Sequence, residues 1–414
     1  MIKIKKSEQI ILKNSSMLLL LNIAKLVVPF ITLPYLTRVL STGTYGLVAY
    51  VKAVMSYMQV IIDFGFMLSA TKEIVDAKND KNEIGKIVGI NITAKLILAG
   101  ISGLILAVLS ICIPILKENV LYTFLSYIVV VLTIFLFDFL FKGIEQMEII
   151  TIRFVVMKGF ATLCTFILVN SDTDVLWIPI LDICGSVIAI LLVCLEVKKL
   201  EIKIKVGNLK ESFYCIKRSA IYFFSNIAST SFNVFNTVVS GIALSTSDVA
   251  YWSVCMQIIN AVQALYTPIS DAIYPEMIRN KKIKLIGKIV KMVGPVVFLE
   301  SIIIFMGAKV GLFIIGGYKY VDAYIALRCL LPVIIFGFLG ILLGWPTLGA
   351  IGKANENTQS TIIAALFQIV MTIVLWKSGK LTLMTMAISR SITEIIMCSI
   401  RYYYYRKYKA LFNS

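Results

Sequence analysis

The chain has 414 residues, of which 59% are hydrophobic and 15% are charged. This composition excludes an ordinary soluble domain and predicts an all-α integral membrane protein. In a soluble protein the net charge of +17 would indicate nucleic-acid binding. In a membrane protein it indicates lysine-rich cytoplasmic loops, so we expect no nucleic-acid partner. The sequence has no histidine and no Cys-x-x-Cys pair, so we expect neither a metal site nor a cofactor.

Residues 14–76 contain two apolar segments of membrane-spanning length, joined by a short polar turn at 38–44. No small-residue cleavage site follows the first segment, so we expect it to remain in the mature protein. Each segment carries a lysine near its middle, Lys25 and Lys52. A charge at the bilayer centre costs roughly 2.5–3.5 kcal/mol on insertion scales, so such side chains are rarely without function.

Further polar residues lie on the same helix faces as these two lysines. One face of the first segment carries Asn22, Lys25, Pro29 and Thr32, and one face of the second carries Lys52, Ser56, Gln59 and Asp63. A polar stripe on a membrane helix must face other protein or a water-filled cavity. The two stripes therefore predict a polar cavity with cationic groups in its wall.

Three sequence stretches resemble a known family. They are LPYLTRVLSTGTYGLVAY at 33–50, IDFGFMLSATKEI at 62–74 and KGIEQMEIITIR at 142–153. These stretches are similar to the polysaccharide flippases, the Wzx or O-antigen-transporter family of the multidrug/oligosaccharidyl-lipid/polysaccharide exporter superfamily. The resemblance implies a transporter with a MATE-like fold rather than an enzyme.

The same resemblance implies a substrate and partners. The substrate would be an oligosaccharide repeat unit of O-antigen or capsule, linked through pyrophosphate to polyprenol (undecaprenol). Such a flippase moves it by alternating access from the cytoplasmic to the outer leaflet of the bacterial inner membrane. The implied partners are this lipid-linked oligosaccharide, the lipid bilayer, a polysaccharide polymerase and a chain-length regulator.

Hydropathy divides the chain into about twelve predicted transmembrane helices. They cover residues 15–36, 45–69, 87–111, 120–141, 154–169, 175–195, 220–243, 249–273, 289–313, 323–345, 361–376 and 381–400. Of the 40 lysines and arginines, about six lie in the loops of one side and about twenty-eight in the termini and the other loops. Because positively charged loops stay in the cytoplasm, we expect both termini to be cytoplasmic.

The two halves of the chain resemble each other. When Ser15 is placed on Ser219, the tripeptide Asn-Ile-Ala at 22–24 falls on the same tripeptide at 226–228. The polar stripes of the first two spans recur in the seventh and eighth. The recurring stripes consist of Asn226, Ser229, Asn233 and Asn236, and of Asn260, Gln263 and Thr267.

This repetition predicts two pseudo-symmetric six-helix lobes, residues 1–195 and 219–414, joined by a cytoplasmic linker at 196–218. Parallel repeats of this kind are typical of alternating-access carriers. The lobes differ in charge, because Ser229 and Met256 replace the two mid-span lysines in the second lobe. One cavity wall should therefore be cationic and the other polar but neutral.

A cationic cavity suits an anionic substrate, and lysine and arginine both bind phosphate oxygens well. The cationic candidates for substrate binding are Lys25, Lys52, Arg328 and Arg390. The polar candidates, which could bind sugar hydroxyls, are Asn22, Gln59, Asn233 and Gln263. The candidates for coupling transport to a proton or sodium ion are Asp63, Asp138, Asp182 and Asp271.

Each charge also has a purely structural interpretation. Lys95 and Lys158 could extend to the nearest membrane surface. Two pairs with helical spacing, Asp138 with Lys142 and Arg390 with Glu394, could neutralise themselves. The two mid-span lysines could pair across helices with Asp63, Asp182 or Asp271. Asp63 could equally serve to position the turn that follows it.

Two other functions compete with lipid-linked oligosaccharide transport. A multidrug antiporter of the same superfamily, which exports organic cations, should carry unpaired carboxylates in its cavity rather than lysines. A membrane-embedded polysaccharide polymerase or glycosyltransferase usually needs a sizeable loop outside the membrane with acidic or arginine clusters. The longest loop here is rich in lysine and contains no Asp-x-Asp pair.

Overall fold

The computed structural model describes residues 6–77 and 80–412, with the side chains of 6–12, 221 and 225 left aside. The described part consists of helices and their connections and contains no strand. The helices form two compact units. The first comprises the chain up to Leu40 together with Val51–Ile227, and the second comprises Ser41–Tyr50 with Ala228–Ser414.

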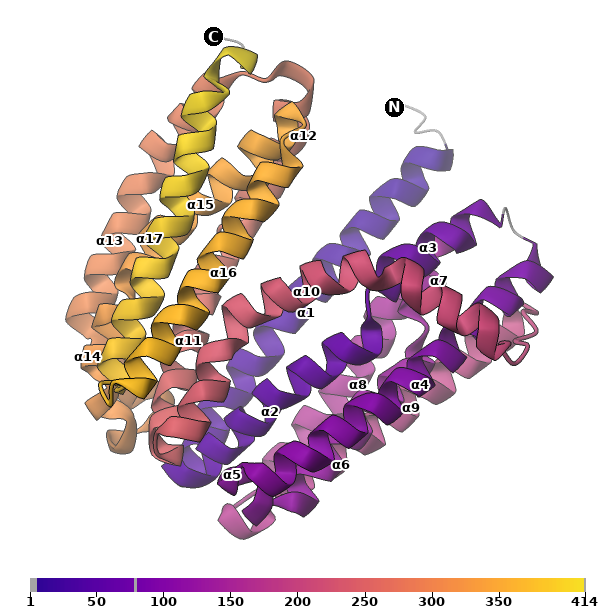
Figure 1. Ribbon diagram of the computed structural model, residues 1–414, viewed down its shortest axis with the longest axis horizontal. Coiled ribbons are helices and arrows are strands. Elements are labelled where there is room, and N and C mark those ends of the chain that lie inside the picture. The colour runs from indigo at the N-terminus through magenta and orange to yellow at the C-terminus, as the bar shows by residue number, and fades with distance from the viewer. Residues whose placement is uncertain (1–5, 78–79, 413–414) are drawn as a thin grey trace. The chain divides into compact units, whose positions relative to one another are not determined.

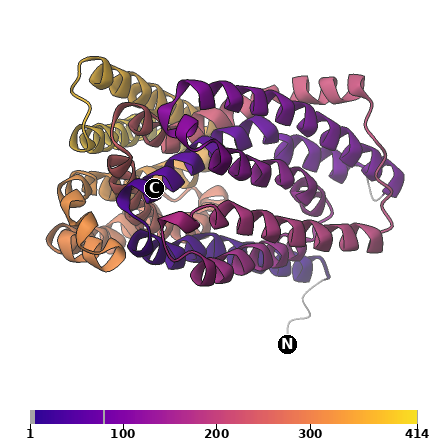
Figure 2. The same ribbon diagram turned by 90° about the horizontal axis from the view of Figure 1, so that it is seen from below.

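The helices of the first unit lie lengthwise beside each other (Figures 1 and 2). They are α1 (Lys6–Val39), α2 (Thr42–Asp63), α3 (Phe66–Asp76), α4 (Lys81–Cys112), α5 (Pro114–Glu118), α6 (Val120–Leu132), α7 (Asp138–Gly143), α8 (Met147–Leu168), α9 (Trp177–Lys199) and the beginning of α10 (Leu209–Ala243). Helix α8 packs against α1 and α9, and α3 packs against α7. Asp80 caps α4, because its side chain accepts hydrogen bonds from the backbone N–H groups of Asn82 and Glu83.

The second unit contains the end of α10 and seven further helices. They are α11 (Thr246–Ala264), α12 (Thr267–Asn280), α13 (Ile283–Gly316), α14 (Tyr324–Cys329), α15 (Leu331–Leu342), α16 (Ala354–Lys377) and α17 (Leu383–Lys407). Helices α16 and α17 run side by side (Figure 1), and α17 also packs against α15. Capping boxes start α11 at Ser245 and α17 at Thr382.

Ten helical stretches within the described residues are long and apolar enough to cross a bilayer. The other two predicted spans are 220–243, which lies in α10, and 249–273, which covers most of α11 and the first half of α12. These segments are helical but carry more polar side chains. Many apolar side chains point outward; Ile111, Leu163 and Met306 are 73%, 66% and 75% exposed. An apolar exterior over helices of this length belongs in lipid, and the chain is a multi-pass membrane protein.

Two helices of the first unit are broken inside their spans. Helix α2 ends at Asp63, and Phe64 and Gly65 adopt left-handed φ values of 39° and 83° before α3 begins. Helix α6 passes through a short 3-10 turn to Phe137, which has a φ of 51°, before α7 begins. A non-glycine residue at positive φ is unusual, and such strain persists only where surrounding contacts hold it.

The second unit also contains a break. After α15 the chain forms a π-helical turn, Leu343–Leu348, in which Gly344 is not helical. The guanidinium of Arg401 on α17 fills this place, since its Nη1 donates a hydrogen bond to the carbonyl of Gly340 at 2.8 Å. A buried side chain thus satisfies a carbonyl near the helix break.

The segment after α9 is bound closely to α4. A Cβ atom added to Gly85 or Gly89 would lie 2.1 Å from the carbonyl oxygen of Lys203 or 1.6 Å from that of Lys205. Only glycine lets the two backbones approach so closely. This packing places residues of the expected 196–218 linker, and α10 as far as Ile227, in the first compact unit.

The start of α2 belongs to the second unit for the same kind of reason. A Cβ atom on Gly46 would lie 1.9 Å from the carbonyl oxygen of Thr246. The hydroxyl groups of Thr42 and Ser247 share a hydrogen bond of 3.0 Å. The compact units therefore differ from the lobes expected at 1–195 and 219–414 in these two segments, and the six-plus-six division stays a prediction.

Candidate substrate-binding site

Most charged side chains within the predicted spans of the first unit form ion pairs. Lys95 Nζ lies 2.7 Å from Asp63 Oδ1. Lys158 Nζ lies 2.7 Å from Asp182 Oδ1. The two lysines that the sequence allowed to extend to the membrane surface are therefore held by carboxylates within the bundle. The two aspartates are also not available to Lys25 or Lys52 as primary partners.

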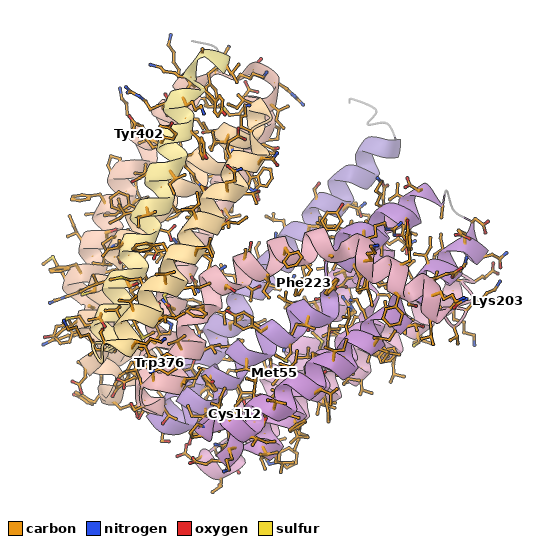
Figure 3. The ribbon with its side chains drawn as sticks, in the orientation of Figure 1. Met55, Cys112, Lys203, Phe223, Trp376 and Tyr402 are labelled. Atoms are coloured by element: carbon orange, nitrogen blue, oxygen red, sulfur yellow. The ribbon has the colours of Figure 1, made fainter. Side chains whose placement is uncertain are left out.

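The Lys95–Asp63 pair belongs to a polar network at the break after α2. The Nε2 of Gln59 donates to Asp63 Oδ2 at 2.7 Å and to Thr133 Oγ1 at 3.0 Å. Phe64 stacks on Phe223 of α10 with ring centroids 4.4 Å apart. Figure 3 labels Phe223 on this helix. Asp63 was considered both for ion coupling and for positioning the turn that follows it. Either role needs a carboxylate that is held in place, and this network holds it beside the turn. Gln59 is likewise engaged by protein groups.

Asp138 pairs with Arg153 on α8 and not with Lys142. Arg153 Nη1 also donates to the carbonyl of Leu136 at 3.2 Å. Arg153 therefore binds on both sides of the break between α6 and α7. The carbonyl of Leu136 lies just before Phe137, and Asp138 begins α7 just after it. The predicted Asp138–Lys142 pair is wrong. Helical spacing brought the two residues near each other, but an arginine from another helix has the better geometry.

Lys25 and Lys142 are left as cations without a carboxylate partner in the described part of the chain. Lys142 and Arg153 are the charged groups that act most strongly on Lys25, and both repel it. Lys25 is exposed, and its Nζ lies 5.7 Å from the centre of the Phe154 ring. Asn22, one helical turn before Lys25, is also exposed. This part of the first unit therefore carries an excess of positive charge.

Lys52 occupies a second cationic position on the same unit. It is exposed and forms no ion pair among the residues with described side chains. Its charged neighbours are the Lys158–Asp182 pair. Since Asp182 is already bonded to Lys158, Lys52 is left as an additional positive charge.

The candidates of the second unit are more fully engaged. Arg390 Nη1 lies 2.7 Å from Glu394 Oε2, and both side chains are buried. The ion pair that the helical spacing allowed is therefore present. Arg328 stacks on Phe305 at 4.4 Å and donates from Nε to the carbonyl of that residue. Both arginines thus have partners within the protein.

Three polar or acidic candidates remain in the second unit. Gln263 Nε2 donates to the carbonyl of Val333 at 3.0 Å. Asn233 is exposed, and its Nδ2 donates to the carbonyl of Ser229 at 2.9 Å. Asp271 is exposed and forms no ion pair in the described ranges, unlike Asp63, Asp138 and Asp182.

The structure also shows a buried polar cluster that sequence reasoning did not connect. Gln368 Nε2 donates to Asn236 Oδ1 at 3.0 Å and to Thr372 Oγ1 at 3.1 Å. Asn236 lay on the recurring polar stripe of the seventh span, but its partners come from α16. The spacing of Gln368 and Thr372, four residues apart, was the signal present in the sequence.

The sequence profile of a family described as "Polysaccharide biosynthesis protein" matches residues 11–281. This match covers more than half of the chain. The chain belongs to this family. The matched range includes both broken helices of the first unit, and it includes Lys25, Lys52 and Lys142.

Two relatives share the name "Putative O-antigen transporter". The protein from Shigella dysenteriae is 28% identical over 333 residues, which cover 78% of this chain and 83% of the relative. The protein from Escherichia coli (strain K12) is 25% identical over 394 residues, covering 92% and 94% of the two chains.

Solved structures share the fold of this family member. The lipid II flippase MurJ in an inward closed conformation is similar with a TM-score of 0.71 at 14% identity, over 95% of this chain and 87% of that one. An inward-facing MATE family multidrug transporter of the MOP superfamily has a TM-score of 0.69 at 14% identity, over 93% and 98%. The predicted MATE-like fold is confirmed.

Proposed function

We propose that the chain is a flippase of the bacterial inner membrane for a polyprenyl-pyrophosphate-linked oligosaccharide, an O-antigen or capsule repeat unit. The names of the two relatives and the fold shared with a lipid II flippase support transport of a lipid-linked sugar. Alternating access of the headgroup between the leaflets is part of the same proposal.

One observation carries the proposed substrate chemistry. Lys25 and Lys52 lie inside predicted membrane spans without a carboxylate partner in the described part, whereas Lys95, Lys158 and Arg390 each have one. An uncompensated cation in a membrane is costly, and a bound anion removes that cost. A pyrophosphate group presents several charged oxygens that lysine ammonium groups bind well.

We assign Lys25 and Lys142 together to one phosphate-binding position and Lys52 to another. The repulsion between Lys25 and its cationic neighbours would fall when an anion binds among them. The Lys158–Asp182 pair beside Lys52 is neutral overall, so Lys52 alone would supply the net positive charge of the second position. Two positions on one unit allow the headgroup to change partners without leaving a cationic environment.

Polar candidates would bind the sugar part of the substrate. Asn22 is exposed one turn from Lys25. Asn233 is also exposed, and its side-chain nitrogen donates to the carbonyl of Ser229. An amide donates and accepts hydrogen bonds, so either residue suits sugar hydroxyl groups. Among the acidic candidates for ion coupling, Asp271 would be the one to bind a proton or sodium ion, because Asp63, Asp138 and Asp182 are held in ion pairs.

The test is complementation of a bacterial strain that lacks its flippase, with surface polysaccharide as the readout. Lys25→Ala and Lys52→Ala should each lower surface polysaccharide about tenfold or more, since a charge-assisted contact is worth roughly 1.5–3 kcal/mol. Lys25→Arg and Lys52→Arg should retain part of the activity. Lys117→Ala, which removes an exposed lysine, is the matched control.

Membrane quantities of each variant must be measured in parallel. If the alanine variants reach the membrane normally and still export polysaccharide at the wild-type level, the lysines do not bind the substrate. If the variants disappear from the membrane, Lys25 and Lys52 are structural residues. Either result would overturn the assignment.

A further inference from the structure

Residues 203–217 connect α9 to the main part of α10. One side of this segment packs against α4, and the other side is exposed. Ser212 is fully buried, and its hydroxyl donates to the carbonyl of Ile90 at 3.2 Å. Cys215 is 3% exposed, and its thiol lies 3.7 Å from Asn91 Oδ1. These contacts hold the segment against α4 and fix which side chains point away from the protein.

The acidic residues near this segment are bonded to α4. Glu201 accepts a hydrogen bond from Lys81 at 2.7 Å, which lowers the pKa of its carboxyl group. Glu211 lies 3.0 Å from Lys86. The negative charges are therefore already neutralised by lysines of the same unit. The lysines on the outer side have no such partners among the described residues.

The outer side combines lysines with large apolar groups. We call it the linker face, and it consists of Lys203, Lys205, Val206, Leu209, Lys210, Phe213, Tyr214 and Lys217. Val206, Phe213 and Tyr214 are 95%, 59% and 68% exposed. Lys203 lies at the edge of the first unit (Figure 3). Such a mixture of basic, aromatic and aliphatic groups is typical of protein surfaces that lie in the membrane interface.

The length of α10 places this face near a membrane surface. The helix has 35 residues and is therefore about 52 Å long, whereas the hydrocarbon core is about 30 Å thick. The predicted span begins at Ala220, so the earlier turns of α10 extend beyond the core. The distribution of lysine and arginine assigns this end to the cytoplasmic side.

We propose that the linker face binds anionic phospholipids of the cytoplasmic leaflet. Val206, Leu209 and Phe213 would enter the interface, and the lysines would contact lipid phosphates. A hollow of about 340 Å³ lies beside them, lined by Ile90, Lys210, Tyr214, Cys215, Arg218 and two carboxylates, Glu73 and Glu211. The carboxylates pair with Arg218 and Lys86, so Lys210 is the lining cation that has no carboxylate partner among the described residues.

The test is amide hydrogen exchange of the full chain in lipid nanodiscs. One preparation contains neutral phosphatidylcholine alone, and the other contains phosphatidylcholine mixed with anionic phosphatidylglycerol. Each lysine near an anionic surface changes the binding equilibrium about fivefold. Residues 203–217 should therefore exchange about fivefold more slowly, or slower still, in the anionic nanodiscs.

The Lys210→Glu/Lys217→Glu double variant should remove the difference between the two lipid mixtures. Lys377→Glu/Lys380→Glu, which reverses two exposed lysines elsewhere, should retain it. Equal exchange of the wild-type segment in both lipids would overturn the proposal, as would a lipid-dependent difference that survives in the 210/217 double variant. Protection that requires added acidic protein instead of anionic lipid would also overturn it.

Discussion

At the residue scale, the pairing of charges separates structural groups from candidates for substrate binding. Arg153 and Lys142 lie close in sequence but differ in this respect. Arg153 bonds to Asp138 and to a backbone carbonyl, whereas Lys142 has no carboxylate partner in the described part and repels Lys25. The two residues should therefore respond differently to substitution.

We predict that Lys142→Ala lowers polysaccharide export about tenfold, as expected for loss of one charged contact to phosphate. Its thermal stability in detergent should stay near the wild-type value. Arg153→Ala should instead destabilise the protein by roughly 1–3 kcal/mol, because it leaves the half-buried Asp138 and the carbonyl of Leu136 without their donor. Thermal unfolding and export are measured on the same variants. A Lys142→Ala protein that unfolds early but exports normally would restore the structural interpretation.

Of the two pairs that helical spacing suggested within one helix, one is present and one is not, and the pairs between helices were not predicted. The Arg390–Glu394 pair follows from helical spacing alone and is present. The Asp63–Lys95 pair joins residues of α2 and α4, and no spacing rule connects positions so far apart. The mid-span location of Lys25 and Lys52 could be read from the sequence. Their lack of carboxylate partners in the described ranges could not.

At the element scale, the breaks in α2 and α6 concentrate the polar groups of the first unit. Gly65 occupies one break with a φ of 83°. A Cβ atom there would lie 2.3 Å from Tyr222 Cβ, so a side chain would meet both backbone strain and a clash.

We predict that Gly65→Ala lowers both the thermal stability of the protein and its export activity. The free energy of unfolding should fall by at least the roughly 1–2 kcal/mol that a left-handed conformation costs alanine. Gly100→Ala is the matched control, because a Cβ atom at Gly100 meets nothing within 4 Å. It should be neutral or stabilising by up to about 1 kcal/mol. The interpretation of the break fails if the two variants unfold at the same temperature.

Hydropathy was sufficient to predict helices but not their interruptions. Within the span at 45–69 a turn was expected after Asp63, but not a left-handed conformation at Phe64. The span at 120–141 appeared continuous, since Phe137 is apolar and fits a helical pattern. The positive φ values of Phe64 and Phe137 result from contacts with neighbouring helices, which periodicity does not contain. The glycine after Asp63 was the one local sign of a break.

At the scale of the whole molecule, topology rests on the distribution of lysine and arginine. The linker should label from the cytoplasm and the loop after α8 from outside. Ser212 is a poor labelling position because it is fully buried. Lys210 and Thr173 are exposed and suit the experiment.

We predict that Lys210→Cys reacts with a membrane-impermeant maleimide only in inverted vesicles, and Thr173→Cys only in intact cells. The exposed native cysteines, such as Cys112 and Cys184, are first replaced by serine. Cys215 can remain, because burial raises the pKa of its thiol to about 11 and keeps it protonated. Labelling of both positions from the same side would contradict the predicted topology.

The division into lobes was only partly accessible from the sequence. The repeated polar stripes indicated duplication, and solved transporters share the fold. The compact units, however, assign Ser41–Tyr50 to the second unit and the linker to the first. Close backbone packing at Gly46 and Gly89 determines these assignments. A single glycine in a sequence does not reveal which backbone it will approach.

The most direct measurement of the central claim compares headgroup charge with lysine charge. Flipping rates of pyrophosphate-linked and monophosphate-linked sugars are measured in proteoliposomes for the wild-type protein and for Lys25→Ala. If Lys25 binds the headgroup, the substitution should slow the more highly charged substrate at least about fivefold more than the other. An equal effect on both substrates would contradict the proposal that unpaired lysines bind the pyrophosphate.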